Sequence, residues 1–264
     1  MKKYKLIAID MDGTLLTSDK KILEETKKDL HYAKENGTTV CICTGRGYPA
    51  IKRYIDEIEL EMPLILYNGS RIRMSDNSSV IYNQVIDQDV AMKVYDVIEA
   101  HNGTCCFWKE DKLYFNKMDE YTNYYLKLTG ISPIIVSSKE KELFSNINKF
   151  IWFATPEYLE EVKSNILVNV EGIDYFKSHS SLLEIVPPNV NKGHTLSELG
   201  KILGINQEEI IAIGDEENDL SMIKYAGLGV AMANAKPIVK ENANYITLSN
   251  DENGVGEVIK KFII

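Results

Sequence analysis

The chain is poor in cysteine, and its four cysteines do not form a C-x-x-C motif. They occur as two tight pairs, Cys41 with Cys43 and Cys105 with Cys106. Zinc and dithiol redox motifs place two residues between their cysteines, so these pairs indicate reduced thiols, which are typical of the cytosol. The four histidines also lack the spacing of metal ligands: His31, His101, His179 and His194. We therefore expect neither a disulfide framework nor a zinc site.

Long apolar runs and an excess of positive charge are also missing. No run approaches the roughly eighteen residues of a membrane span, and the apolar start of the chain meets an acid at Asp10, too early for a signal peptide. The 30 basic residues are outnumbered by 39 acidic ones, which gives a formal net charge of −9. Such a charge disfavours non-specific binding to nucleic acid or anionic membranes. We expect a cytoplasmic protein without a nucleic-acid or membrane partner, in which a site for an anionic ligand is locally basic.

Short apolar segments alternate with amphipathic ones at both ends of the chain. The expected strands are 5–9, 38–43, 64–67, 210–213, 229–232 and 245–248. The expected helices are 24–36, 48–58, 192–203, 219–225 and one that starts near 255. Strands separated by helices of this length form right-handed βαβ units. The pattern predicts an α/β fold with a Rossmann-like parallel sheet, built from residues 1–82 and 187–264.

The middle of the chain has a different pattern, with both tryptophans and less regular alternation. Strands are expected at 112–116, 148–154 and 181–186, and helices at 90–101 and 156–165. Pro187 and Pro188 end this stretch, because paired prolines continue neither a helix nor a strand ladder. We predict an inserted α+β domain at 83–186.

The segment Asp10–Thr14 follows the first expected strand and carries two acids. Alternation along a strand places Asp10 and Asp12 on the same face, where two carboxylates repel unless a cation or a shared proton offsets them. In open α/β sheets, ligands bind at this end of the strands. The alternative is that Asp12 and Gly13 form only a turn.

Three further segments place polar groups at other junctions between a strand and a helix. Residues 44–46 offer a hydroxyl, a glycine and a helix N-terminus, which together suit an anion. Lys192 offers an ammonium at the start of another helix, and residues 214–219 offer carboxylates suited to Mg²⁺. The sequence therefore predicts one site for a phosphate and a metal ion at this edge of the sheet.

Each of these segments has a simpler explanation when it is taken alone. Thr44 could be a helix N-cap, Lys192 a solvated charge, and Asp215 with Asp219 an acidic helix start favoured by the helix dipole. Four such segments in this order make the simpler explanations jointly improbable.

The sequence resembles the haloacid dehalogenase-like (HAD) hydrolases, specifically the Cof-type branch with a large α/β (type IIB) cap, which includes sugar phosphatases. The similar segments run nearly from end to end: 9–16, 44–46, 67–69, 183–185, 190–193, 213–219, 230–235, 249–250 and 254–255. The resemblance implies an α/β core with the cap inserted after the third core strand.

By this resemblance, Asp10 is the nucleophile and shares Mg²⁺ with Asp215 and with the backbone carbonyl of Asp12. The side chain of Asp12 is then the general acid, and afterwards the base that activates water. Asp219 is not a metal ligand itself and stabilises either the metal site or Lys192. An ionised carboxylate is a competent nucleophile for phosphoryl transfer, which needs charge neutralisation and in-line positioning.

The expected phosphate-binding residues are Thr44, Gly45, Lys192 and Asn218. Arg46 and Asn68 lie just past strand ends and are the candidates for substrate contact. The resemblance implies a Mg²⁺-dependent phosphatase that hydrolyses a small phosphate monoester, either a sugar phosphate or a phosphorylated cofactor, through an aspartyl-phosphate.

Two alternatives remain open. A phosphotransferase or phosphomutase would pass the phosphoryl group from the same aspartate to an alcohol. A non-catalytic regulator that binds a phospholigand could use the same fold, because fold alone does not establish function. Such a regulator would be expected to lack Asp10 or Asp12, and both are present.

Overall fold

The computed structural model describes residues 4–76 and 79–263. The chain divides into two compact units. The core unit comprises Met1–Arg46, Lys52–Tyr82 and Asn191–Ile264, and the inserted unit comprises Asn83–Val190 with Gly47–Ile51. Among the described residues, no helix combines the length and the apolar character that a membrane span requires. The predicted domain at 83–186 stays a prediction.

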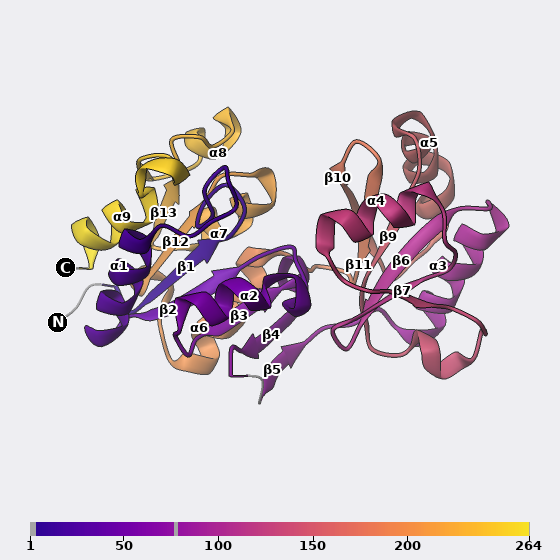
Figure 1. The fold of residues 1–264 in the computed structure, drawn as a ribbon, viewed down its shortest axis with the longest axis horizontal. Helices are drawn as coiled ribbons and strands as arrows, with labels where there is room; N and C mark the ends of the chain where they lie inside the picture. Colours follow the sequence, from indigo (N-terminus) through magenta and orange to yellow (C-terminus); the bar gives the residue numbers. More distant parts are fainter. Residues whose placement is uncertain (1–3, 77–78, 264) are drawn as a thin grey trace. The chain divides into compact units, whose positions relative to one another are not determined.

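The core unit contains an eight-stranded sheet in the order β14-β13-β12-β1-β2-β3-β4-β5. Its strands are β1 (Leu6–Asp10), β2 (Thr39–Cys43), β3 (Pro63–Leu66), β4 (Arg71–Met74), β5 (Val80–Asn83), β12 (Ile210–Gly214), β13 (Leu228–Ala231) and β14 (Tyr245–Ile246). The strands from β14 to β3 pair in parallel, and β4 turns back antiparallel to β3. In Figure 1 the indigo β1 lies between β2 and the orange β12, so the two ends of the chain build one sheet.

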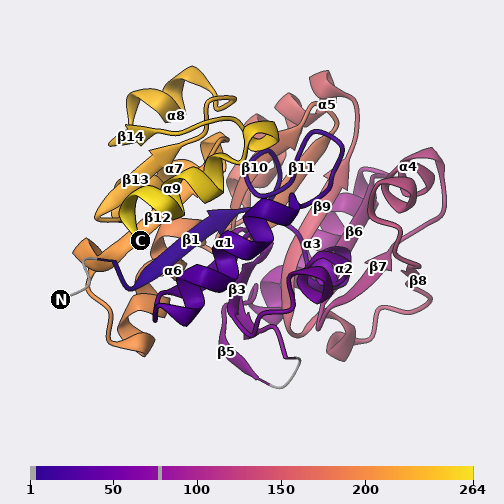
Figure 2. The same ribbon diagram turned by 60° about the vertical axis from the view of Figure 1, so that its left-hand side comes forward.

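Helices cover both faces of this sheet, and this explains why its central strand β1 is apolar from Leu6 to Ile9. Every residue of β1 is buried, as expected for a parallel strand with both faces covered. Leu6 and Ala8 pack in one cluster with side chains of α6 (Lys192–Leu203) and α7 (Leu220–Tyr225). Ile7 and Ile9 point to the opposite face. Two helices from the two ends of the chain, α1 (Glu24–Glu35) and α9 (Gly254–Phe262), pack against each other (Figure 2).

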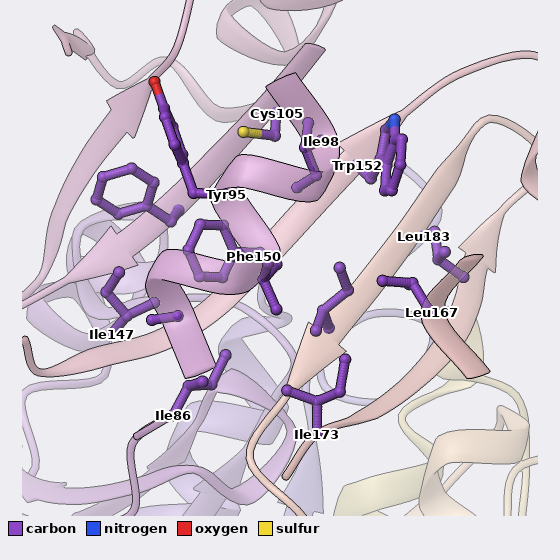
Figure 3. Packing of buried hydrophobic residues seen from close by; sticks show 14 of the residues in the cluster. Ile86, Tyr95, Ile98, Cys105, Ile147, Phe150, Trp152, Leu167, Ile173 and Leu183 are labelled. Atoms are coloured by element: carbon purple, nitrogen blue, oxygen red, sulfur yellow. The ribbon is translucent and has the colours of Figure 1, made fainter. Parts of the chain in front are cut away.

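The inserted unit contains a six-stranded sheet in the order β10-β11-β9-β6-β7-β8. Its strands are β6 (Thr104–Lys109), β7 (Lys112–Phe115), β8 (Ile134–Ile135), β9 (Ile147–Phe153), β10 (Asp174–His179) and β11 (Leu182–Val186), and its main helices are α3 (Gln88–Ala100), α4 (Glu120–Thr129) and α5 (Pro156–Glu161). Side chains from α3 and the central strands form its hydrophobic core, among them Tyr95, Phe150 and Trp152 (Figure 3). This unit therefore has a core of its own.

The predicted fold class, an α/β chain with a Rossmann-like parallel core and an inserted α+β segment, is confirmed. The predicted helices 48–58 and 192–203 match α2 (Tyr48–Ile58) and α6. The predicted helix 156–165 is also helical in the structure, where α5 ends at Glu161 and continues as the π-helical turn Val162–Ile166. The expectations also omitted β4, β5, β6 and α4.

Candidate active site

The predicted site residues follow strands that run in parallel, so they meet at one edge of the core sheet. Asp10 is the last residue of β1, Thr44 follows β2, and Asp215 follows β12. Lys192 is the first residue of α6, which packs against this sheet through Leu196 and Leu199. Strand topology thus brings together residues that are far apart in the sequence.

Lys192 is fully buried and joins two carboxylates. Its Nζ donates to Asp10 Oδ1 and to Asp219 Oδ1, each at 2.5 Å. Asp219 Oδ2 accepts from the backbone N–H groups of Asp215 and Glu216, both at 3.0 Å. The explanation of Lys192 as a solvated charge is therefore wrong, since the ammonium has no exposure to solvent and is paired with acids.

Three buried acids form the centre of the site. Carboxylate oxygens of Asp10, Asp215 and Asp219 all lie within 4.8 Å of one another. Thr14 Oγ1 donates to Asp215 Oδ1 at 3.0 Å. Gly13 has φ +77° and passes so close that a Cβ there would lie 2.3 Å from Asp215 Oδ2. A glycine is therefore required beside this carboxylate.

The electrostatics of the group reflect an excess of negative charge. Burial, with the nearby charge of Asp219, raises the pKa of Asp10 well above its ordinary value. The same two causes raise the pKa of Asp215 to about 7. The pKa of Lys192 is also raised, because Asp10 and Asp219 outweigh the effect of burial. Three carboxylates against one ammonium leave a deficit of positive charge that a cation would offset.

The side chain of Asp12 turns to two cations. Arg46 Nε donates to its Oδ2 at 2.7 Å and Arg46 Nη2 to its Oδ1 at 2.5 Å, and Lys20 Nζ donates to Oδ1 at 3.0 Å. Burial acts to raise the pKa of Asp12, but the bonds from Arg46 and Lys20 prevail and lower it. Lys20 was missed by the sequence analysis, because a lysine in a polar loop carries no signal of a contact with an acid.

The remaining candidates form a second cluster next to the acids. Thr44 is buried, and its Oγ1 accepts from the N–H of Arg46 at 3.1 Å. Asn218 Nδ2 donates to Asn68 Oδ1 at 3.1 Å. A Cβ on Gly45 would lie 2.8 Å from that same Asn68 oxygen. The structure thus brings Gly45, Asn68 and Asn218 together.

Side chains from the C-terminal part of the chain fix the loop that follows β1. Asn234 Nδ2 donates to Gly13 O at 2.8 Å, and Asn250 Nδ2 donates to Leu16 O at 2.9 Å. Asp251 accepts from the N–H of Ser18 at 2.8 Å and from its hydroxyl at 2.7 Å. These contacts hold the loop that carries Thr14 and Lys20, a function that the sequence analysis did not give to this region.

Comparison with known proteins agrees with this architecture. A family model described as haloacid dehalogenase-like hydrolase matches residues 7–259. The Bacillus subtilis protein YxeH is 36% identical over 267 residues, which cover 99% of this chain and 99% of YxeH. Bacillus subtilis YitU, named 5-amino-6-(5-phospho-D-ribitylamino)uracil phosphatase, is 33% identical over 262 residues, 97% of each protein.

A solved structure gives the same result. The crystal structure of a haloacid dehalogenase-like hydrolase from Bacteroides thetaiotaomicron matches with a TM-score of 0.90 at 32% identity, and the match covers 98% of this chain and 99% of that one. Since the family model spans nearly the whole chain and relatives align from end to end, the chain belongs to the haloacid dehalogenase-like hydrolases.

Proposed function

We propose that this haloacid dehalogenase-like phosphatase releases inorganic phosphate from a small phosphate monoester through a covalent phosphate on Asp10. The observation that carries the proposal is the position of the Asp10 carboxylate. It lies at the end of β1, bonded to a buried ammonium and beside two further acids. Acids in this arrangement suit covalent phosphoryl transfer with a metal ion.

The donor set fits Mg²⁺, which prefers oxygen ligands. We propose that Asp10, Asp215 and the backbone carbonyl of Asp12 hold the ion, and that Asp219 supports the site through Lys192 and the backbone of the Asp215 loop. When bound, Mg²⁺ would neutralise charge on the phosphoryl oxygens and on the acids. The excess negative charge of the cluster supports this assignment.

In the first step, a carboxylate oxygen of Asp10 forms a bond to phosphorus while the bond from phosphorus to the leaving oxygen breaks. Asp12 supplies the proton that the leaving oxygen takes up. Lys192, Thr44, Gly45 and Asn218 bind the phosphoryl oxygens and stabilise their charge. Arg46 leaves the Asp12 carboxylate to contact the incoming anion. The carboxylate oxygens that it leaves can then carry the proton.

In the second step, water attacks phosphorus and Asp12 accepts the proton of the water. The bond from phosphorus to Asp10 then breaks, which restores the carboxylate and releases phosphate. The bonds of Arg46 and Lys20 to Asp12 favour its ionised form, the form that a base needs. In the first step Arg46 contacts the anion and no longer favours the ionised form, so Asp12 can hold the proton there and serve both steps.

The Asp12→Asn variant is expected to separate the two steps. Asparagine accepts no proton from water, so we expect the second step to slow by about 10²- to 10⁴-fold. With p-nitrophenyl phosphate, whose leaving group needs no acid, the variant should release one equivalent of p-nitrophenol in a burst and then nearly stop. Stopped-flow absorbance measures this burst. Steady turnover at the wild-type rate would contradict the role of Asp12.

Binding of Mg²⁺ is expected to strengthen as the pH rises toward 7. The pKa of Asp215 is raised to about 7 without metal, and a metal ligand must be deprotonated to bind. The same shift makes the free energy of unfolding fall as the pH rises from the unfolded pKa of this carboxyl to about 7, because the unfolded acid has lost its proton there while the folded acid still holds it. The rise in melting temperature on adding Mg²⁺ should thus be larger at pH 8 than at pH 5.5. Equal rises would contradict a metal site at Asp215.

The substrate class is proposed as sugar phosphates and phosphorylated cofactors. Support comes from YitU, which is named for a phosphorylated ribityl compound, and from the inserted unit, which we propose acts as a cap. Phosphate release from a panel of phosphorylated metabolites, with Mg²⁺ and no acceptor alcohol, tests hydrolysis directly, with Asp10→Asn as the background. If the phosphoryl group is only transferred to an added acceptor alcohol, or if no ester releases phosphate, the proposal fails.

A further inference from the structure

The turn after β3 has a backbone that side chains rarely adopt. Three consecutive residues have positive φ: Tyr67 at 54°, Asn68 at 58° and Gly69 at 112°. For a bulky residue such as Tyr67, which is fully buried, this is an outlier that persists only where the surroundings enforce it. Outliers of this kind cluster at functional sites. The question is therefore which contacts this turn serves.

Backbone contacts of the turn reach two of the loops that carry predicted phosphate ligands. The N–H of Tyr67 donates to Arg46 O and the N–H of Asn68 donates to Thr44 O, both at 3.1 Å. Gly69 O accepts from Thr195 Oγ1 of α6 at 2.6 Å. A Cβ on Gly69 would lie 2.6 Å from the carbonyl oxygen of Asn191, next to Lys192. The turn thus fixes the loop 44–46 relative to the start of α6.

The Asn68 side chain adds the third loop. Its Oδ1 accepts from Asn218 Nδ2 at 3.1 Å. The same oxygen packs so close to Gly45 that a Cβ there would lie 2.8 Å from it. Asn68 is buried, whereas Asn218 lies at the surface. The amide nitrogen of Asn218 carries two hydrogens. One is bonded to Asn68, and the second can be donated to a phosphate oxygen. A buried residue thereby orients an exposed one.

We infer that Asn68 is a positioning residue that acts on the phosphoryl group through Asn218 and is not itself a contact of the leaving group. This inference rests on the proposed function, because it assigns Asn218 to the phosphate. Asparagine suits the position for two reasons. It tolerates the left-handed backbone better than most residues, and its short side chain places an acceptor oxygen between Gly45 and Asn218.

A double-mutant cycle tests the inference with Asn68→Gly, Asn218→Ala and the double variant. Glycine keeps the left-handed backbone, so the protein should remain folded, as its melting temperature can verify. We expect Asn68→Gly to lower kcat/KM about three- to tenfold, and Asn218→Ala by a similar factor. The double variant should match Asn218→Ala alone, because each single change removes the same oriented amide. The matched control is Asn102→Gly, a left-handed asparagine in the inserted unit (φ 51°), which should keep wild-type kinetics.

Two further measurements distinguish a positioning role from a merely structural one. The loss in Asn68→Gly should be the same for p-nitrophenyl phosphate and for a metabolite phosphate, and inhibition by inorganic phosphate should weaken by the same factor. Three outcomes would each overturn the inference: losses that multiply in the double variant, a loss confined to the metabolite, or no loss at all. In each case, turnover by the wild-type protein still upholds the proposed function. An inactive wild-type protein would overturn both.

Discussion

Replacement of Asp10 by asparagine is expected to abolish phosphate release, with a fall in kcat of at least about 10⁴-fold. The amide has nearly the shape of the carboxylate but cannot attack phosphorus. It also removes one negative charge from the buried acid group, so folding should be retained. Initial rates of phosphate release in Mg²⁺, with the melting temperature as a check on folding, measure the effect.

Asp29→Asn is the matched control for this variant. Asp29 lies in α1, is about as buried as Asp10 (8% against 5% exposed), and accepts from Asn253 outside the site. The same chemical change there should leave kcat within a factor of about two, because Asp29 bonds to Asn253 and not to the acids of the site. Comparable losses in both variants would show that the effect of Asp10 is structural.

Replacement of Lys192 by methionine is expected to reduce both stability and turnover. The change leaves Asp10 and Asp219 buried without the ammonium that joins them, and breaking a buried ion pair costs about 3–5 kcal/mol of unfolding free energy. Turnover should fall by about 10²- to 10³-fold through kcat, since the charge on the phosphoryl group grows in the transition state. Denaturant titration and steady-state kinetics measure the two effects.

The effect of Mg²⁺ on stability distinguishes the loss of Lys192 from the loss of an ordinary buried ion pair. The metal would offset part of the negative charge, so it should restore part of the stability of Lys192→Met. Lys149→Met is the comparison, because Lys149 is also buried and donates to Glu184 at 3.0 Å in the inserted unit. Its loss of stability should not respond to Mg²⁺. Wild-type stability and kcat in Lys192→Met would contradict the role of this lysine.

The positions of the central strands could be predicted because burial on both faces leaves an apolar run that ends at a polar residue. β1 ends at Asp10 and β2 ends at Cys43, just before Thr44. Parallel pairing then implies that these residues share one edge with Asp215, which follows β12 in the last third of the chain. The grouping of the acids thus followed from strand order and the known end at which ligands bind.

Other features left no pattern that could be seen in the sequence. β4 carries Arg71 and Arg73, whose charges conceal a strand at the side of the sheet. The contact between Lys20 and Asp12 depends on a tight turn in which the N–H of Lys20 donates to Thr17 O. The bond between Asn68 and Asn218 joins residues 150 positions apart and depends on a left-handed backbone. Such contacts arise from loop geometry, which hydrophobic periodicity does not encode.

The most direct test of the account is to trap the phosphoenzyme. Asp12→Asn protein is mixed with p-nitrophenyl phosphate and Mg²⁺, quenched in acid and mapped by peptide mass spectrometry. The account predicts one added phosphoryl group on Asp10, removable by hydroxylamine as an acyl phosphate, and none in the Asp10→Asn variant. A phosphoryl group on a histidine, or one that persists when Asp10 is replaced, would contradict it.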